Sequence, residues 1–300
     1  MPHPSYLAYR SAAAIARVLP REIGERTACA VGRATARLMP VRRRQVRANM
    51  VRATDGRVVG RELDQVVSEV FASYGRYWFE LFRLPYEARD PGAIDRHIVV
   101  EGYEHIAAGL DAGSGIILAT PHVGGFEMAA AFLAERGLRP TVVVEPVEPP
   151  ELFEWFSAVR REFGMEVVAL GPDAGIAMAT ALRENRPVCL VSDRDLGGDG
   201  VEVEFFGERT TLPAGPALLA LRTRAPLLAS SCFYLPHGRH LAYVCPPIPV
   251  DRRGRLREDI ARITQELAHR FEDLIRAAPT QWHLMQPNWP SDHQANRDAG

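Results

Sequence analysis

A histidine and a glutamate lie five positions apart in the stretch "LATPHVGGFEM", residues 118–128. His122 follows a strongly apolar run, and Glu127 follows two glycines, Gly124 and Gly125. A histidine at the end of a strand can act as a general base on a hydroxyl group, and a carboxylate on its other ring nitrogen fixes the tautomer and stabilises the imidazolium. The glycines allow a tight turn, and the N–H groups at the start of the next helix can stabilise a developing oxyanion. The spacing predicts either a catalytic pair or only a strand-to-helix turn.

A second group of polar residues follows another apolar run, in "LVSDRDLGGDGVEVEFF". Arg194, at the end of a strand, suits a phosphate or sugar-phosphate headgroup because its guanidinium forms paired hydrogen bonds. A structural network of Arg194 with Asp193 and Asp195 explains the same residues equally well. Glu202 and Glu204 alternate with apolar residues and therefore share one strand face. Either one of them faces the site, or both are exposed charges of an edge strand.

The residues that the chain lacks exclude several kinds of chemistry. All 36 basic residues are arginines, so a Schiff-base lysine and a Walker-type phosphate loop are absent. The sequence has no G-x-S-x-G elbow and no dinucleotide-binding glycine motif in a suitable context. The four cysteines and nine histidines show no metal spacing, and His237 and His240 are expected in a solvated loop. Without a nucleophile or a metal, His122 must activate a hydroxyl that the substrate supplies.

From residue 97 onward, apolar periodicity predicts strands and helices in alternation. The predicted strands span residues 97–102, 115–121, 141–146, 165–170 and 187–193. The predicted helices span residues 103–112, 125–137, 151–164, 173–185, 212–224 and 257–278. Two later strands, at 227–235 and 241–247, are expected to be antiparallel or edge strands. The alternation predicts an α/β fold with a mostly parallel central sheet and helices on both faces.

The first part of the chain has a different pattern. Residues 5–83 show helical spacing, with breaks at Pro20 and Pro40 and an end before Pro85. We divide the chain into a helical extension packed on the core (1–95), an α/β core (96–290) and a disordered tail (291–300).

The charge of this extension differs from that of the whole chain. Through Met50 there are ten arginines and two glutamates, a net charge of +8, whereas the whole chain carries −1. Such a segment either meets anionic lipid headgroups or forms solvated helices. The overall charge argues against a nucleic-acid partner. No apolar run in the sequence is long enough to span a bilayer, so a peripheral membrane protein is expected.

Three sequence blocks resemble a known family. In order along the chain they are "ATPHVGGFE", "DRDLGGDGVEVEFFGERTTLPAGPALLA" and "QWHLMQPNWPSD". Together they resemble the lysophospholipid acyltransferase superfamily, within it the lipid A late-acyltransferase branch, and most of all the actinobacterial phosphatidylinositol mannoside acyltransferases. The resemblance covers almost the whole chain.

The resemblance implies a set of site residues. They are catalytic His122 as general base, Glu127 as its motif partner and Glu202 as a further acid of the relay, and substrate-binding Arg160, Arg194, Gly124, Gly125 and Glu204. Arg161 is the alternative match for Arg160. An apolar tunnel for the acyl chain is expected under Trp78, Phe82 and Phe126.

The resemblance also implies the reaction. A long-chain acyl group moves from acyl-CoA, the co-substrate, to a mannose hydroxyl of a phosphatidylinositol mannoside or similar anionic glycolipid. No metal or other cofactor takes part, and the protein works at the cytoplasmic face of the inner membrane. Three alternatives stay open: a lipid A-type acyltransferase acting on another glycolipid, a non-catalytic acyl-CoA or lipid carrier, and a thioesterase that releases fatty acid without an acceptor.

Overall fold

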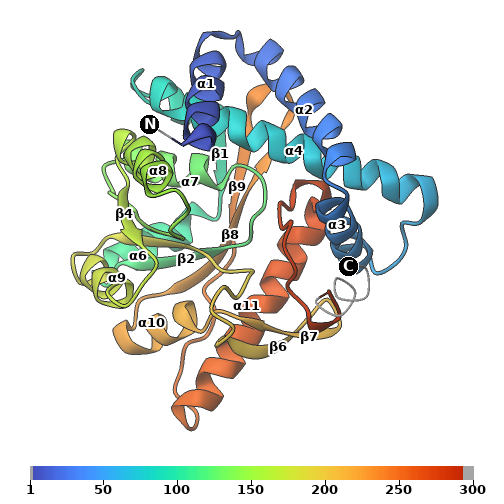
Figure 1. Ribbon diagram of the computed structural model, residues 1–300. Coiled ribbons are helices and arrows are strands. Elements are labelled where there is room, and N and C mark those ends of the chain that lie inside the picture. The colour runs from blue at the N-terminus through green and yellow to red at the C-terminus, as the bar shows by residue number, and fades with distance from the viewer. Residues whose placement is uncertain (1–2, 293–300) are drawn as a thin grey trace.

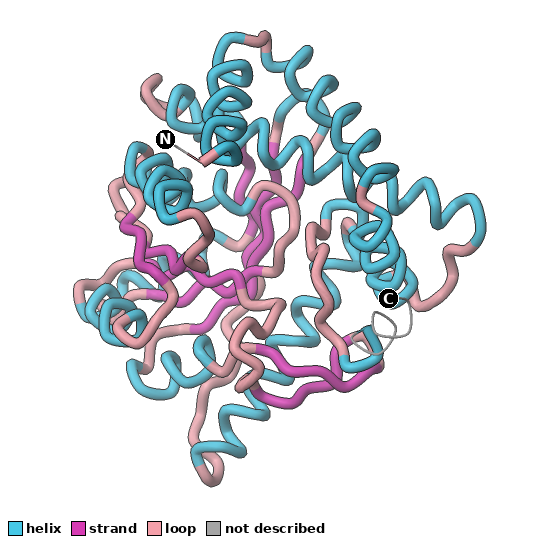
Figure 2. The backbone as a smooth tube through the Cα atoms, in the orientation of Figure 1, coloured by secondary structure: helices cyan, strands magenta, loops and turns pink. Residues whose placement is uncertain are grey.

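The computed structural model describes residues 3–292 and centres on a seven-stranded sheet. Its strand order is β1-β9-β8-β2-β5-β3-β4, and every neighbouring pair is parallel except β8 and β9. The strands are β1 (Ile98–Glu101), β2 (Ile116–Thr120), β3 (Thr141–Val144), β4 (Glu166–Ala169), β5 (Pro187–Val191), β8 (Leu227–Tyr234) and β9 (His240–Val244). A separate antiparallel hairpin pairs β6 (Val201–Phe205) with β7 (Glu208–Leu212), away from the sheet (Figure 2).

Eleven α-helices and two short 3₁₀ helices surround the sheet in the described part of the chain. The helices are α1 (Pro4–Val18), α2 (Arg21–Leu38), α3 (Pro40–Ala53), α4 (Gly60–Glu87), α5 (Ala93–His97), α6 (Tyr103–Asp111), α7 (Phe126–Glu135), α8 (Pro150–Glu162), α9 (Ala174–Arg183), α10 (Gly215–Thr223), α11 (Leu256–Ala277), η1 (Pro236–Gly238) and η2 (Pro279–Gln281).

The strand residues alternate between two hydrophobic cores, one on each face of the sheet. Ile117 and Ala119 of β2 pack in a core with residues of α9, α10 and α11. Ile116 and Leu118 of the same strand pack in a second core with α6, α7 and α8. Because successive side chains of a strand point to opposite faces, a strand covered on both sides must be apolar throughout. The predicted parallel α/β fold is confirmed, and β8 and β9 are antiparallel to each other but lie inside the sheet.

The N-terminal helices are joined to the sheet through α4. Its residues contribute to both cores, Phe71 to one and Leu81 to the other. Helices α1, α2 and α3 lie along α4 at the top and right of Figure 1. The boundary that we placed at residue 95 falls inside α5. Within residues 3–292, no helix combines the length and the apolar content that crossing a bilayer requires.

One helix end and the start of the tail differ from the sequence-based expectation. Helix α4 continues through Pro85 to Glu87, because a proline in the last turn interrupts the hydrogen-bond pattern only once. Ser291 and Asp292, placed in a disordered tail, are helical, and the carboxylate of buried Asp292 accepts hydrogen bonds from Gln45 (2.7 Å) and Arg52 (2.8 Å). The rest of that tail lies outside the described residues.

Candidate active site

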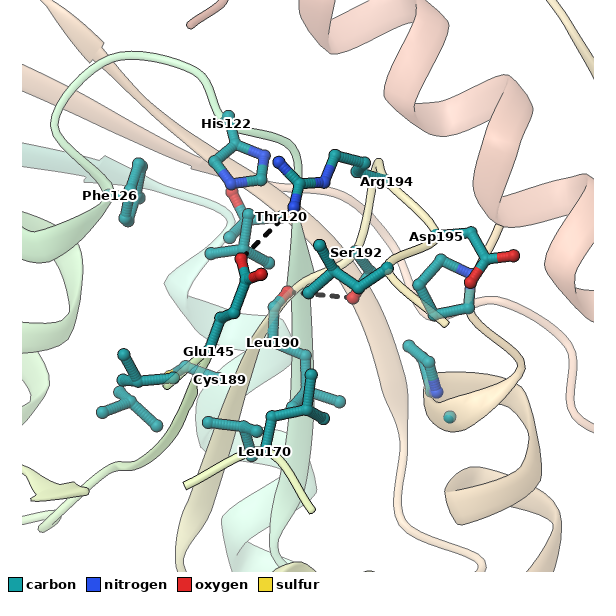
Figure 3. Close-up of a pocket in the computed structure, with 18 of the residues that line it drawn as sticks. Thr120, His122, Phe126, Glu145, Leu170, Cys189, Leu190, Ser192, Arg194 and Asp195 are labelled. Atoms are coloured by element: carbon teal, nitrogen blue, oxygen red, sulfur yellow. Dashed lines mark hydrogen bonds and ion pairs between the residues drawn. The ribbon is translucent and has the colours of Figure 1, made fainter. Parts of the chain in front are cut away.

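His122 lies where β2 ends and α7 has not yet begun, at the carboxyl edge of the parallel strands. Ligands of open α/β sheets bind at this edge. The residue lines a cavity of about 730 Å³, and its side chain is 34% exposed (Figure 3). The ring is therefore neither sealed in the core nor fully solvated, which suits a base that must meet a substrate.

Asp193 is the carboxylate that holds the imidazole. Its Oδ1 lies 2.5 Å from Nδ1 of His122, and its Oδ2 accepts the backbone N–H of His122 at 3.0 Å. The indole N–H of Trp282 donates to the same Oδ2 at 2.8 Å. Burial alone would raise the pKa of this fully buried carboxyl, but the charge of the nearby imidazole and these hydrogen bonds hold the pKa below its usual value. Asp193 thus occupies Nδ1 and leaves Nε2 free to accept a substrate proton.

Glu127, expected to be the partner of His122, has a different partner. Its Oε1 accepts Nε of Arg160 at 3.0 Å, a closer contact from Nη2 of the same residue, and the hydroxyl of Tyr77 at 3.2 Å. The side chains of Glu127 and Arg160 are only 8% and 11% exposed. Glu127 is in the first turn of α7 and meets an arginine from α8, so it joins two helices beside the cavity. The assignment of Glu127 to the histidine ring is wrong, whereas Arg160 does line the cavity and Arg161 is on the exposed side of α8.

Gly124 and Gly125 bring the turn against β8. Their N–H groups donate to the carbonyl oxygens of Gln281 (2.9 Å) and Cys232 (2.8 Å). Gly124 has φ +61°, and a Cβ there would lie 2.1 Å from the carbonyl oxygen of Cys232. Only glycine fits so close an approach in this conformation. Both N–H groups are therefore occupied by backbone carbonyl oxygens, and the oxyanion site that we expect at the start of the next helix stays a prediction.

A buried hydrogen-bonded pair, His240 and Glu80, packs against this turn. A Cβ at Gly125 would lie 3.0 Å from the His240 ring, and Nε2 of His240 lies 2.8 Å from the carboxylate of Glu80. Burial would raise the pKa of Glu80, but His240, Arg76 and Arg21 lower it to about 2. His240 is fully buried on β9 and is not the solvated loop residue that we expected.

Arg194 reaches the cavity, as predicted for a strand-end arginine. Its Nη2 donates to a carboxylate oxygen of Glu145 at 3.2 Å (Figure 3). The Arg194 side chain is 17% exposed and that of Glu145 is 52% exposed, so the pair lies at the mouth. Asp195 does not pair with Arg194. Its carboxylate accepts the backbone N–H groups of Gly197, Gly198 and Gly200 and so stabilises the loop after β5.

Glu202 and Glu204 lie outside the cavity. They occupy the exposed face of β6, and the side chain of Glu202 is 70% exposed and 3.3 Å from Arg209. On the opposite face, Val203 and Phe205 are buried in the core that contains α11. Burial of these two apolar side chains fixes the orientation of β6. Because side chains alternate along a strand, both glutamates then face the solvent. Their predicted roles as a relay acid and a substrate ligand are wrong.

Aromatic and aliphatic residues form most of the remaining wall. Trp78 and Phe126, expected at an acyl tunnel, line the cavity together with Tyr74 and Tyr77. Other parts of the wall are aliphatic, formed by Val142, Val144, Leu170, Met178 and Leu190. Phe82 lies in a neighbouring hydrophobic cluster with Phe156 and does not line the cavity, contrary to the expectation. A largely apolar cavity next to His122 and the arginines Arg160 and Arg194 can hold an aliphatic chain that ends at a reacting carbonyl.

The segment after α11 completes the site, and the sequence-based reading gave it no role. It returns beside α3 toward the β6–β7 hairpin (Figure 1). Val123 and Trp282 form an antiparallel bridge, and the amide of Asn288 donates to the backbone oxygen of Asp193 at 3.0 Å. The block "QWHLMQPNWPSD" was the available signal, but spacing alone cannot indicate which distant residue it contacts.

His283, in the same segment, is a second histidine of the cavity wall. Its backbone N–H donates to the carbonyl oxygen of His122 at 2.7 Å, and its Nε2 lies 2.9 Å from Oγ of Ser73. The side chain is 5% exposed. Burial, and then the nearby His122, lower its pKa to about 3, so this imidazole is neutral at physiological pH.

Sequence comparison identifies the class of protein that this fold and site define. The chain matches the family of bacterial lipid A biosynthesis acyltransferases over residues 1–291. It belongs to that family and is an acyltransferase, which confirms the resemblance carried by the three sequence blocks.

The curated relatives are more specific. The phosphatidylinositol mannoside acyltransferase of Mycobacterium tuberculosis (strain CDC 1551 / Oshkosh) is 40% identical over 240 residues, which cover 79% of this chain and 74% of that protein. The protein of the same name from Mycolicibacterium smegmatis (strain ATCC 700084 / mc(2)155) is 38% identical over 259 residues, which cover 85% of this chain and 82% of that protein.

Proposed function

We propose that this acyltransferase transfers a long-chain acyl group from acyl-CoA to a mannose hydroxyl of a phosphatidylinositol mannoside. The names of the mycobacterial relatives support the acceptor. The observation that carries the proposal is the His122–Asp193 pair at the edge of an aromatic and aliphatic cavity. A base without a nucleophile beside it suits direct transfer to an alcohol.

In the proposed reaction, Nε2 of His122 takes the proton of the acceptor hydroxyl while the oxygen attacks the thioester carbonyl. The buried carboxylate of Asp193 stabilises the imidazolium that forms. Collapse of the tetrahedral intermediate breaks the C–S bond, and the imidazolium returns the proton to the leaving thiolate. The products are an acyl ester and free CoA, and His122 is again neutral.

The remaining residues bind and position substrates. Arg194 suits an anionic group at the mouth, such as the lipid phosphate or the phosphates of CoA, once it exchanges Glu145 for that group. Trp78 and Phe126 contact the acyl chain. Glu127 and Arg160 hold α7 against α8 and thereby keep the wall in place, because a buried ion pair with paired hydrogen bonds fixes geometry.

The N-terminal helices supply the proposed membrane contact, at the cytoplasmic face of the inner membrane. Their surface combines arginines with exposed apolar side chains, such as Val18 (80% exposed), Leu38 (80%) and Val31 (60%). Arginines attract anionic headgroups, and apolar side chains insert at the boundary of the acyl layer. This combination supports the proposal of a peripheral enzyme that meets its lipid acceptor at the membrane surface.

Product analysis tests the proposal. Purified protein is incubated with palmitoyl-CoA and a panel of acceptors that contains phosphatidylinositol, phosphatidylinositol mannosides and lipid A precursors, and mass spectrometry identifies the products. We expect one added palmitoyl group on the mannosides, with thiol release at least tenfold slower when the acceptor is omitted. Equal thiol release with and without acceptor indicates a thioesterase, binding without turnover indicates a carrier, and acylation of a lipid A precursor alone indicates another glycolipid as substrate.

A further inference from the structure

Trp282 is bound directly to the acid–base pair although it lies outside the cavity. Its indole N–H donates to Oδ2 of Asp193 at 2.8 Å, and its side chain is fully buried. The residue is not part of the cavity wall, so it can act on the reaction only through the residues that it contacts. The proposed reaction gives it no step.

The two carboxylate oxygens of Asp193 have different partners. Oδ1 lies 2.5 Å from Nδ1 of His122. Oδ2 accepts the indole N–H of Trp282 and, at 3.0 Å, the backbone N–H of His122. Two donors on Oδ2 fix the rotation of the carboxylate, so that Oδ1 faces the imidazole ring. Trp282 thus orients the acid that in turn orients the base.

The indole ring is itself held in place. Trp282 and Val123, the residue after the base, form an antiparallel bridge. The ring packs against Phe206 and Trp289, with centroids 5.6 Å and 6.4 Å away. A donor that is fixed by both its backbone and its ring leaves its acceptor little freedom to rotate.

A hydrogen bond to a carboxylate also weakens the action of its charge on a neighbour. Burial raises the pKa of Asp193, but the nearby imidazole and the donors that include Trp282 hold it below the usual value. His122 and Asp193 are in contact, so they bind a proton as a coupled pair. A donor that withdraws charge from the carboxylate therefore lowers the proton affinity of the pair.

Ionisable side chains on the neighbouring elements have partners of their own. These are Glu127 with Arg160, Glu145 with Arg194, Glu80 with His240, and Asp195 with the N–H groups of its loop. The pKa of His283 is about 3 and that of Glu80 about 2, and burial raises the pKa of Tyr77 well above its ordinary value. These three groups do not change charge near neutral pH, so they do not move a rate profile there.

We propose that Trp282 is a positioning residue for acyl transfer, whose indole N–H holds the Asp193 carboxylate toward His122 and limits the proton affinity of the pair. The inference rests on the proposed function, because its main readout is the rate of that transfer. It assigns to the segment after α11 an effect on turnover and none on substrate binding.

One matched pair of substitutions isolates the indole N–H. Trp282→Phe removes this donor and keeps an aromatic ring in the core. Trp289→Phe makes the same change at a second fully buried tryptophan, whose N–H donates instead to the carbonyl oxygen of Phe205 at 3.2 Å. Palmitoyl transfer from palmitoyl-CoA to a phosphatidylinositol mannoside is measured from pH 5 to pH 9 with each substrate varied. Thermal unfolding is recorded on the same preparations.

We expect Trp282→Phe to lower kcat roughly threefold to tenfold, the effect of one lost hydrogen bond, with both KM values unchanged. The fall in rate on the acid side of the profile should move to higher pH by about half a unit to one unit, because the pair then binds a proton more tightly. Trp289→Phe should lose similar thermal stability and keep the wild-type kcat and profile. An acid side that stays in place in Trp282→Phe overturns the inference, and so does an equal shift in Trp289→Phe.

The wild-type chain supplies the test if Trp282→Phe does not fold. The four indole N–H resonances are followed by NMR from pH 9 to pH 5 and assigned by Phe substitution at the other three tryptophans. The Trp282 resonance should move over the same pH range in which turnover falls, and the Trp289 resonance much less. A constant Trp282 resonance contradicts the inference. If the wild-type protein acylates no mannoside, the proposed function fails, whereas the Trp282 resonance still reports proton uptake by the pair.

Discussion

Nδ1 of His122 and Oδ1 of Asp193 lie 2.5 Å apart, although 71 positions separate the two residues along the chain. The order of strands in the sheet explains this contact. β2 and β5 are parallel neighbours in register from Ile116 with Pro187 to Thr120 with Val191. Each strand is followed two residues later by one member of the pair, so both members emerge at the same edge. The acid–base pair is therefore produced by sheet topology and not by the five-residue spacing of His122 and Glu127.

Replacing the base should abolish transfer and leave the fold intact. We expect His122→Ala to lower the rate of acyl transfer at least a hundredfold, the usual contribution of a general base. The side chain is 34% exposed, so its removal leaves no closed cavity in a core, and the midpoint of thermal unfolding should change by only a few degrees. Product formation and thermal unfolding are measured on the same preparation. Near-normal turnover by this variant would refute the assignment.

The two carboxylates near the site should differ in their effect on catalysis. Asp193→Asn places an amide where three N–H groups converge, which leaves donors facing donors and disfavours the required tautomer of His122. We expect a loss of kcat of about 10²–10⁴-fold. Glu127→Gln keeps a hydrogen-bond acceptor for Arg160. Its loss of kcat should be at least tenfold smaller than that of Asp193→Asn.

These kcat values are compared with the free energy of unfolding of each variant. Because Glu127 contacts a buried arginine, its replacement should lower stability by a few kcal/mol. If Glu127→Gln abolishes turnover in a fully stable protein while Asp193→Asn remains active, the acid partner of His122 has been misassigned.

Glu80 should make stability depend on pH in the acid range. Its pKa is about 2 in the folded protein, against an ordinary value of 4.5. The unfolded chain therefore binds the proton more readily, so the stabilisation is complete above about pH 4.5 and is lost as the pH falls toward 2. Glu80→Gln leaves the largely buried Arg76 without its counter-ion and should cost about 3–5 kcal/mol at pH 7.

The measurement is urea denaturation of both proteins from pH 7 to pH 2. The difference between them should shrink through the window from 4.5 to 2. Glu62→Gln, at an exposed position in the first turn of the same helix, is the control and should shift stability by under about 1 kcal/mol. A constant difference at every pH would mean that the carboxyl of Glu80 is not held ionised by its neighbours.

The basic N-terminal surface should bind anionic membranes. Arg43 and Arg47 pair with Asp64 at 3.1 and 2.8 Å, whereas Arg42 and Arg44 are exposed. Replacing Arg42 and Arg44 by Gln should weaken binding to vesicles of phosphatidylinositol and phosphatidylcholine about tenfold or more, since each charge near such a surface contributes about 1 kcal/mol.

Sedimentation with vesicles at low and high salt measures this effect, which salt should reduce. The control replaces Arg222 and Arg257, exposed arginines of α10 and α11, by Gln. Equal sedimentation of the two double variants would show that α3 is only a solvated surface.

Local periodicity was sufficient for most of the fold and insufficient for the contacts within the site. Six of the seven strands of the sheet were predicted to within two residues and β9 to within three, because a strand buried on both faces is apolar throughout. The positions of His122 and Arg194 at strand ends followed from the same pattern. The partner of His122 did not, because a motif shows proximity along the chain and not between strands.

Two other errors have a similar origin. Alternation correctly placed Glu202 and Glu204 on one face of β6, but it could not show that β6 forms a separate hairpin with its apolar face against α11. His240 was taken as a loop residue because it lies close to Gly238, whereas the structure pairs β9 with β1 and buries the side chain of His240. Both outcomes depend on contacts between residues far apart in sequence.

The hydrogen bond from the indole N–H of Trp282 to the carboxylate of Asp193 has a consequence for biosynthesis. All seven strands of the sheet precede residue 245, so the sheet residues are made before Trp282 and Asp193 at first lacks the indole hydrogen bond. Proteins are made from the N-terminus, and early segments fold first. The site therefore becomes complete only when the segment around Trp282 is made. Because Trp282 and Trp289 are fully buried in the core that contains α11, messages cut short before this segment should yield polypeptides that lose stability together with activity.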